Sequence, residues 1–244
     1  MYISTYEELA AFCGRARGFA AVAIDTEFLR ERTYHAKLCL VQVATPEECA
    51  VIDPLAIEDL APLADLMVDV DTLKVFHACS QDMEVLNHAL GVCPTPIFDT
   101  QVAAGFLGER AQCSYHNLVH SFCDVSLPKT ESLTDWSRRP LTPQQVEYAI
   151  DDVRYLIDAY RVIESKLHSL GRTAWVRDEI RPLADPAHYR SDPRSAFKRV
   201  KRVNSCTRRQ LAVARELAAW REQRAETRDI PRKWIMSDEV LLAL

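Results

Sequence analysis

The first hundred residues alternate between short apolar runs and helical patterns. Runs with a β-strand composition occur at residues 20–27, 37–44, 49–53, 73–76 and 97–98. Only a short polar stretch separates the first two runs, which favours a hairpin. Helical spacing of apolar positions follows Thr5, where Thr-x-x-Glu is a capping-box pattern, and recurs at 57–67 and 81–90. This order predicts an α/β fold, a sheet flanked by helices.

The second half of the chain is predicted to be mostly helical. A helical pattern with breaks covers residues 100–122, and a polar, irregular connection covers 127–140. Thr142 and Pro143 form a typical helix start, and that helix is expected to reach about residue 170. Several prolines and a basic run indicate a linker at 171–205. The predicted organisation is therefore a body at 1–170, this linker, and a short all-helical extension at 206–244.

Composition is that of an ordinary globular protein. Hydrophobic residues make up 48% of the 244 positions and charged residues 27%. No apolar run is long enough to cross a membrane, and the N-terminal residues lack the pattern of a signal peptide. The eight cysteines are scattered without a CxxC pair, which favours free thiols in a reducing compartment. We therefore expect a cytoplasmic protein; its oligomeric state is left open.

The net charge of −5 conceals an uneven distribution. Residues 190–233 carry 14 Lys or Arg against 5 Asp or Glu, a local balance of +9, whereas residues 1–189 have a balance of −12. A basic segment behind an acidic body indicates a polyanionic partner such as a nucleic acid. A solvated basic helix would produce the same pattern.

Two carboxylates end the first predicted strand. Asp25 and Glu27 are two residues apart, so on a strand they project from the same face. Burying such a pair is costly unless something neutralises it, and a divalent cation such as Mg²⁺ or Mn²⁺ suits hard oxygen ligands. The alternative is an Asp that caps the following turn, next to an exposed Glu.

Further acids occur at other element ends. Asp82 lies in the opening turn of a predicted helix, where an acid also complements the helix dipole. Tyr148 and Asp152 are four residues apart on the long helix and therefore share a face. A partly exposed helical acid is the alternative for Asp152.

Taken together, these residues resemble the tyrosine-bearing DEDD 3′–5′ exonucleases, and among them the ribonuclease D family. The resemblance covers about residues 1–170, and the segment from about Arg208 is similar to the start of a helicase-and-RNase-D C-terminal (HRDC) domain. Four further stretches are similar to that family: 77–82, 98–101, 134–141 and 147–149. The family implies a ribonuclease H-like fold with a mixed sheet.

The resemblance also implies a mechanism. Asp25, Glu27, Asp82 and Asp152 would hold two divalent metal ions, Mg²⁺ or Mn²⁺, and Tyr148 would orient the attacking water. The implied reaction is two-metal hydrolysis that releases nucleoside 5′-monophosphates from RNA 3′ ends, with tRNA precursors or other structured RNAs as substrates. Six further residues are candidates for substrate contact: Phe28, Leu29, Lys198, Arg199, Lys201 and Arg202.

Several alternatives stay open. His77 is also a candidate for substrate contact, although a structural role in a turn is the simpler expectation. The residues around Phe28 and Leu29 would be a solvated hairpin loop if they do not meet RNA. The same metal chemistry would suit a DNA exonuclease, and a catalytically inactive RNA-binding protein is the alternative from a different class.

Overall fold

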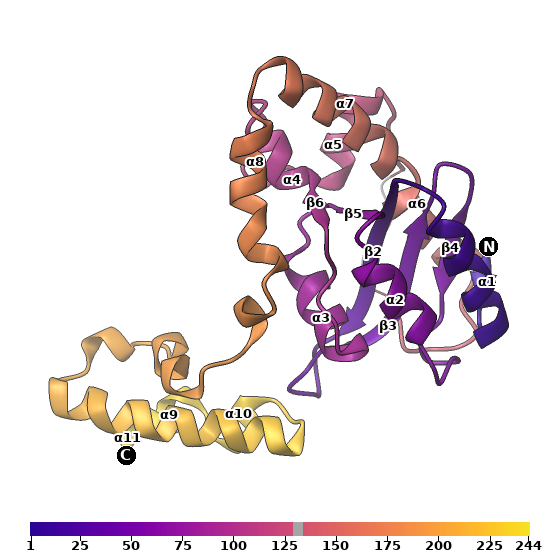
Figure 1. Ribbon diagram of the computed structural model, residues 1–244. Helices are drawn as coiled ribbons and strands as arrows, with labels where there is room; N and C mark the ends of the chain where they lie inside the picture. Colours follow the sequence, from indigo (N-terminus) through magenta and orange to yellow (C-terminus); the bar gives the residue numbers. More distant parts are fainter. Residues whose placement is uncertain (129–133) are drawn as a thin grey trace. The chain divides into compact units, whose positions relative to one another are not determined.

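Six strands form one mixed sheet in the order β1-β4-β3-β2-β5-β6 in the computed structural model (Figure 1). Strands β2, β5 and β6 run parallel, whereas β4 is antiparallel to β3 and parallel to β1. The strand bounds are β1 Tyr2–Ile3, β2 Ala21–Leu29, β3 Lys37–Ala44, β4 Cys49–Ile52, β5 Leu73–Phe76 and β6 Ile97–Asp99. The sheet confirms the predicted mixed α/β class. It also contains β1, which the sequence does not predict because a strand of two residues is too short to show a periodic pattern.

The structure describes residues 1–128 and 134–244, which fall into two compact units. We call them the sheet unit, residues 1–28 and 38–188, and the helical unit, residues 29–37 and 189–244. Part of the irregular connection expected at 127–140 lies outside the described residues.

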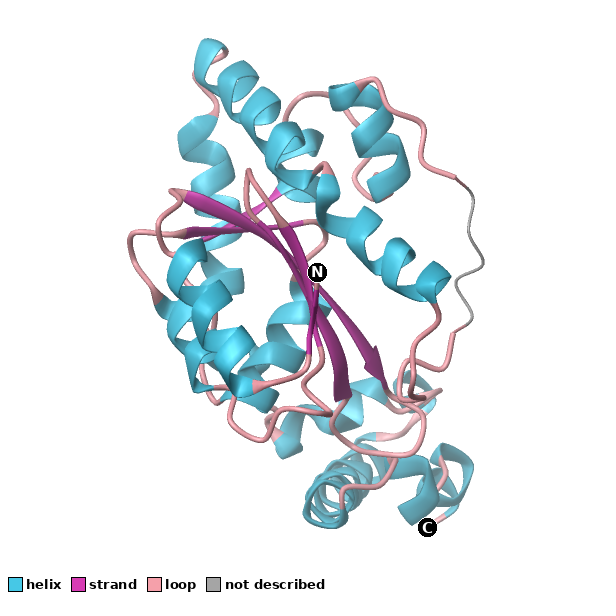
Figure 2. Ribbon diagram, turned by 90° about the vertical axis from the view of Figure 1, so that its right-hand side faces the viewer, coloured by secondary structure: helices cyan, strands magenta, loops and turns pink. Residues whose placement is uncertain are grey.

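Helices cover both sides of the sheet (Figure 2). Those of the sheet unit are α1 Tyr6–Ala16, α2 Ala61–Val68, α3 Ser80–Leu90, α4 Thr100–Gly105, α5 Tyr115–Cys123, α6 Pro143–Arg154, α7 Leu156–Ser169 and α8 Thr173–Ile180. The core that supports the candidate site joins Ala23 of β2 and Val75 of β5 to buried residues of α6, α7 and α8. It therefore fixes β2 and α6, the two elements that carry most of the predicted site.

The long helix expected from Thr142 is interrupted. It divides at Tyr155 into α6 and α7, where the backbone N–H of Tyr155 donates to the hydroxyl of Tyr115 at 3.3 Å. Helical periodicity continues through this break, so the sequence pattern does not reveal it. Thr142 caps α6 as predicted, with Gln145 completing a capping box.

The predicted linker at 171–205 is instead largely helical. Its first part is α8, whose Val176 and Ile180 are buried in the core of the sheet unit. Four short 3₁₀ helices follow: Arg181–Ala184, Pro186–Tyr189, Pro193–Arg199 and Val203–Ser205. Proline fixes a backbone angle suited to the first turn of a helix, so the prolines here begin 3₁₀ turns rather than leave an irregular chain.

The helical unit contains α9 Arg208–Arg228, α10 Arg232–Ile235 and α11 Asp238–Ala243. Its small core packs Val200 and Val203 against Ala214, Ala218 and Leu241. An ion pair at 2.8 Å joins the buried Arg221 of α9 to Asp238 of α11. These contacts hold the short helices against α9.

The described residues bear on two expectations drawn from composition. None of the helices there is both long and apolar enough to span a bilayer. All eight cysteines are free thiols.

Candidate active site

A cleft of about 210 Å³ in the sheet unit brings together residues from distant parts of the sequence. Its lining residues are Asp25, Glu27, His77, Tyr115, Tyr148, Asp152 and Leu156. Asp25 and Glu27 come from the part of β2 that follows Ala23, the partner of Val75 in β5. Four of the five residues expected to form the catalytic centre therefore meet in one hollow.

Helix α6 contributes Tyr148 and Asp152 to the lining of the cleft. Their i,i+4 spacing places both side chains toward the cleft, as the sequence predicts. The indole of Trp136 stacks on the ring of Tyr148, with ring centroids 5.9 Å apart and an interplanar angle of 28°. Trp136 is almost fully buried, so it restricts the orientations open to the phenol.

Asp82 does not line the cleft but lies close enough to affect its charge. It sits in the first turn of α3, is buried, and accepts a hydrogen bond from the hydroxyl of Thr26. Thr26 lies between the two acids of β2, so this bond ties Asp82 to the strand that carries Asp25 and Glu27.

All four carboxylates have raised pKa values, and burial is the first cause for each of them. The pKa of Asp25 lies well above its usual range, first because of burial and then because of the charges of the other three acids. Burial, followed by the charges of Asp152 and Asp82, raises the pKa of Glu27 to about 8. Burial also raises the pKa of Asp82 and Asp152. So many carboxyl groups sharing one volume favour either protonation or a bound cation.

The donor set fits hard divalent cations, although its geometry is not that of a ready-made site. Among residues 1–128 and 134–244, no three His, Cys, Asp or Glu side chains form a group that could hold a metal ion. Carboxylate oxygens are nonetheless the ligands that Mg²⁺ and Mn²⁺ prefer, and their mutual repulsion in the cleft is what a cation would relieve.

Both ring nitrogens of His77 lie within hydrogen-bonding distance of neighbouring residues, which a structural role requires. Its Nδ1 lies 3.0 Å from the hydroxyl of Thr100, and its Nε2 lies 2.9 Å from the carbonyl oxygen of Cys113. Both ring nitrogens are therefore engaged, although the ring itself lines the cleft.

Sequence reasoning missed two residues that line the cleft, Tyr115 and Leu156. The Tyr115 hydroxyl accepts from the backbone of Tyr155, and burial raises its pKa. Tyr115 follows an N-cap serine at the start of α5. No local pattern distinguishes it from an ordinary core tyrosine.

A larger hollow of about 510 Å³ shares Tyr115, Tyr148 and Asp152 with the cleft. Its other lining residues are Ser114, His116, Leu127, Pro128 and Asp151. The hollow offers space for a nucleotide beside the acids, and its lining offers apolar, aromatic and polar groups for contact.

The predicted substrate residues are divided between the two units. Phe28 belongs to the sheet unit, whereas Leu29 belongs to the helical unit together with Lys198, Arg199, Lys201 and Arg202. Of these basic residues, Arg199 is committed to an internal contact, because its Nη2 donates to Oε1 of the buried Glu222 at 2.8 Å.

The chain is similar to known protein families over most of its length. Residues 1–168 match the protein family described as 3′-5′ exonuclease, and residues 210–244 match the HRDC domain. The ribonuclease D of Nitrobacter hamburgensis is 46% identical over 241 residues, which cover 98% of this chain and 63% of that protein. That of Jannaschia sp. is 44% identical over 247 residues, covering 99% and 64%. The chain thus spans less than two thirds of the length of these relatives.

The chain is also similar to solved structures of exonucleases and related proteins. Escherichia coli RNase D, an exoribonuclease involved in structured RNA processing, superposes with a TM-score of 0.92 at 36% identity, covering 100% of this chain and 65% of that one. Brucella melitensis NrnC bound to pGG has a TM-score of 0.64 at 29% identity, covering 75% of this chain and 88% of that one. The same protein is also known with bound Mg²⁺.

Proposed function

The chain belongs to the 3′–5′ exonuclease family, and from that premise we propose that it is a metal-dependent exoribonuclease. It would remove nucleoside 5′-monophosphates one at a time from RNA 3′ ends. The observation that carries the proposal is the convergence of Asp25, Glu27, Tyr148 and Asp152 on one cleft, with the charge of Asp82 beside them.

We assign the four carboxylates to two divalent cations, Mg²⁺ or Mn²⁺. Asp25, Glu27 and Asp152 line the cleft, and Asp82 would act from its edge. When bound, the cations supply the positive charge that stabilises the attacking and leaving oxygens of a phosphodiester. The elevated pKa values of these acids are consistent with a cluster that requires such charge.

Tyr148 would orient the attacking water. Burial and the nearby carboxylates raise its pKa, so the phenol stays protonated at neutral pH and can donate a hydrogen bond. Trp136 restricts the phenol ring by stacking on it. Tyr148 would therefore position the water and would not carry a charge itself.

The proposed substrate is RNA with an accessible 3′ end, with tRNA precursors and other structured RNAs as the expected class. Support comes from the relatives named ribonuclease D and from the E. coli enzyme's role in structured RNA processing. The cytoplasm is the expected location, in keeping with eight free cysteines.

The test uses a 3′-labelled RNA with an unpaired end and a DNA of the same sequence. Each is incubated with the full chain, with Mg²⁺ or Mn²⁺ and with EDTA, and Asp25→Asn serves as the inactive control. Metal-dependent release of labelled nucleoside 5′-monophosphate from RNA supports the proposal. Equal or faster degradation of DNA would favour a DNA exonuclease, and RNA binding without product would favour an inactive binding protein.

A further inference from the structure

Residues 29–37, which contain the loop between β2 and β3 and which we call the loop 29–37, are held by α9 and by the residue that follows it. The backbone N–H groups of Tyr34 and His35 both donate to Oδ1 of Asp229, at 3.0 and 3.1 Å. Two consecutive N–H groups converging on one carboxylate oxygen form a strong, charge-assisted contact. In the sequence, these two residues lie 195 and 194 positions before Asp229.

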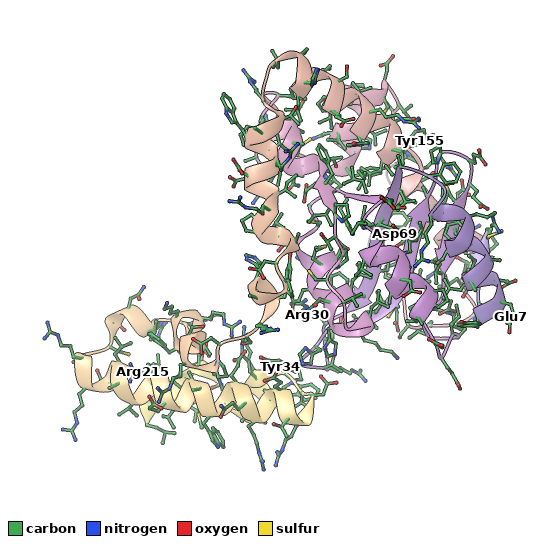
Figure 3. The ribbon with its side chains drawn as sticks, in the orientation of Figure 1. Glu7, Arg30, Tyr34, Asp69, Tyr155 and Arg215 are labelled. Carbon is green, nitrogen blue, oxygen red and sulfur yellow. The ribbon has the colours of Figure 1, made fainter. Side chains whose placement is uncertain are left out.

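A second contact secures the side chain of Tyr34. Its hydroxyl donates to Oε1 of Glu222 at 2.9 Å, and the same oxygen accepts from Arg199 at 2.8 Å. Glu222 is 1% exposed. A carboxylate buried to this extent is costly unless its partners stay in place, so the loop and helix α9 stabilise each other. Figure 3 shows Tyr34 on the loop, beside this helix.

Asp229 adopts a conformation that glycine would adopt more easily. It caps the C-terminus of α9 with a φ of 45°, the left-handed region where glycine is the usual residue. A residue other than glycine in that region costs backbone strain energy. A function of the Asp229 carboxylate would offset this energy. Holding the two N–H groups of the loop is such a function.

We propose that Asp229 and Glu222 are positioning residues, which fix the loop 29–37 so that it can bind RNA. We call these two residues and their bonds to Tyr34 and His35 the loop anchor. The loop begins two residues after Glu27 in the sequence and carries Leu29, Arg30 and Arg32. Fixing it in advance reduces the conformational entropy that RNA binding would otherwise cost.

The first test measures the loop itself, so it does not depend on nuclease activity. In Asp229→Gly the backbone keeps its left-handed conformation while the carboxylate is removed. We expect amide hydrogen exchange at Tyr34 and His35 to accelerate about tenfold or more, since a hydrogen bond to a charged group contributes on that order. Glu216→Gln is the matched control, because Glu216 lies on the same helix and its ion pairs are with Arg194 and Arg215.

The second test rests on the proposed function and separates binding from turnover. We expect Asp229→Gly and Tyr34→Phe to raise KM for RNA about three- to tenfold, with kcat changing less. Asp229→Asn, which retains a carbonyl oxygen as acceptor, should restore part of the affinity. A purely structural defect would lower the fraction of active protein and hence kcat without this pattern.

Unchanged exchange in Asp229→Gly would overturn the anchor. Faster exchange with an unchanged KM would overturn its role in RNA binding. If the wild-type chain has no nuclease activity, the proposed function fails. Fluorescence anisotropy with labelled RNA then still tests the role of the anchor in RNA binding: weaker binding by Asp229→Gly supports that role, and equal binding contradicts it.

Discussion

The guanidinium of Arg139 donates two hydrogen bonds to the carboxylate of Asp53, from Nε at 2.6 Å and from Nη2 at 2.7 Å. Asp53 directly follows β4 and is nearly fully buried. Nη1 of the same guanidinium donates to the carbonyl oxygen of Trp136 at 2.7 Å. One arginine thus ties the sheet to the segment whose indole stacks on Tyr148.

Replacing Arg139 should therefore destabilise the protein. Arg139→Ala leaves the buried Asp53 without its bidentate partner, and we expect a loss of about 3 kcal/mol in the free energy of unfolding. The neighbouring Arg138→Ala is the control, because Arg138 is exposed and solvent screens its ion pair with Asp135, so its loss of stability should be much smaller. Urea unfolding of both variants measures the difference, and equal losses would contradict this account.

The acids of the cleft should make the metal-free protein less stable as pH rises. Their pKa values are raised in the folded state, so the folded protein binds more protons than the unfolded chain between about pH 4 and about pH 8. Unfolding free energy must then fall across that window. Thermal unfolding in EDTA should give a lower Tm at pH 8 than at pH 5.

Asp25→Asn tests the source of this effect. It removes one charge from the cluster, so it should raise Tm at pH 8 and change it less at pH 5, because the raised pKa of Asp25 favours the neutral carboxyl group as pH falls. Asp158→Asn, an exposed acid on α7, is the control. Added Mg²⁺ should raise the Tm of the wild type most at pH 8. A Tm that does not vary with pH would show that repulsion among the cleft acids does not destabilise the folded protein.

Tyr148→Phe should be a milder defect than Asp152→Ala. The phenylalanine variant lacks one hydroxyl that positions water while the cluster of acids remains, so we expect kcat to fall about 10- to 100-fold. Asp152→Ala removes a proposed metal ligand and should reduce turnover to background. Single-turnover RNA cleavage at saturating metal compares the two, with Tyr6→Phe as a control. If Tyr148→Phe loses as much activity as Asp152→Ala while Tyr148→Phe still binds metal normally, the tyrosine takes part in the chemistry directly.

The sequence predicts the parts of the site that depend on local spacing. Alternation along a strand places Asp25 and Glu27 on one face of the sheet, and the helical repeat places Tyr148 and Asp152 on one face of α6. All four side chains line the cleft. The family resemblance supplies the link among these distant acids, and the fold agrees with it.

Long-range packing explains what the sequence does not predict. Tyr115 lines the cleft because α5 packs beside α7, a relationship that no local pattern encodes. The loop 29–37 has the composition of a solvated hairpin, yet Asp229 and Glu222 hold it within the helical unit. Arg199 is part of a basic run, yet its guanidinium pairs with a buried acid.

The pairing of Arg199 changes how the basic segment should be tested. Neutralising Arg199 would leave Glu222 without one of its partners, so weaker RNA binding would then have two causes. Lys198, Lys201 and Arg202 are exposed and can be changed without disturbing that pair. The informative variant is therefore the triple substitution of these three residues by Gln, with Arg199 retained.

If the segment attracts RNA to an acidic body, the triple variant should bind RNA more weakly at low salt. For each phosphate that the variant no longer neutralises, the slope of log K against log salt should become shallower by about 0.7, because fewer counterions are released from a single strand. Turnover at saturating RNA should barely change, since these residues lie outside the cleft lining. The control replaces Arg161, Arg177 and Arg181 by Gln and removes the same charge. An unchanged KM and salt slope in the first variant would instead assign RNA attraction to Arg30 and Arg32.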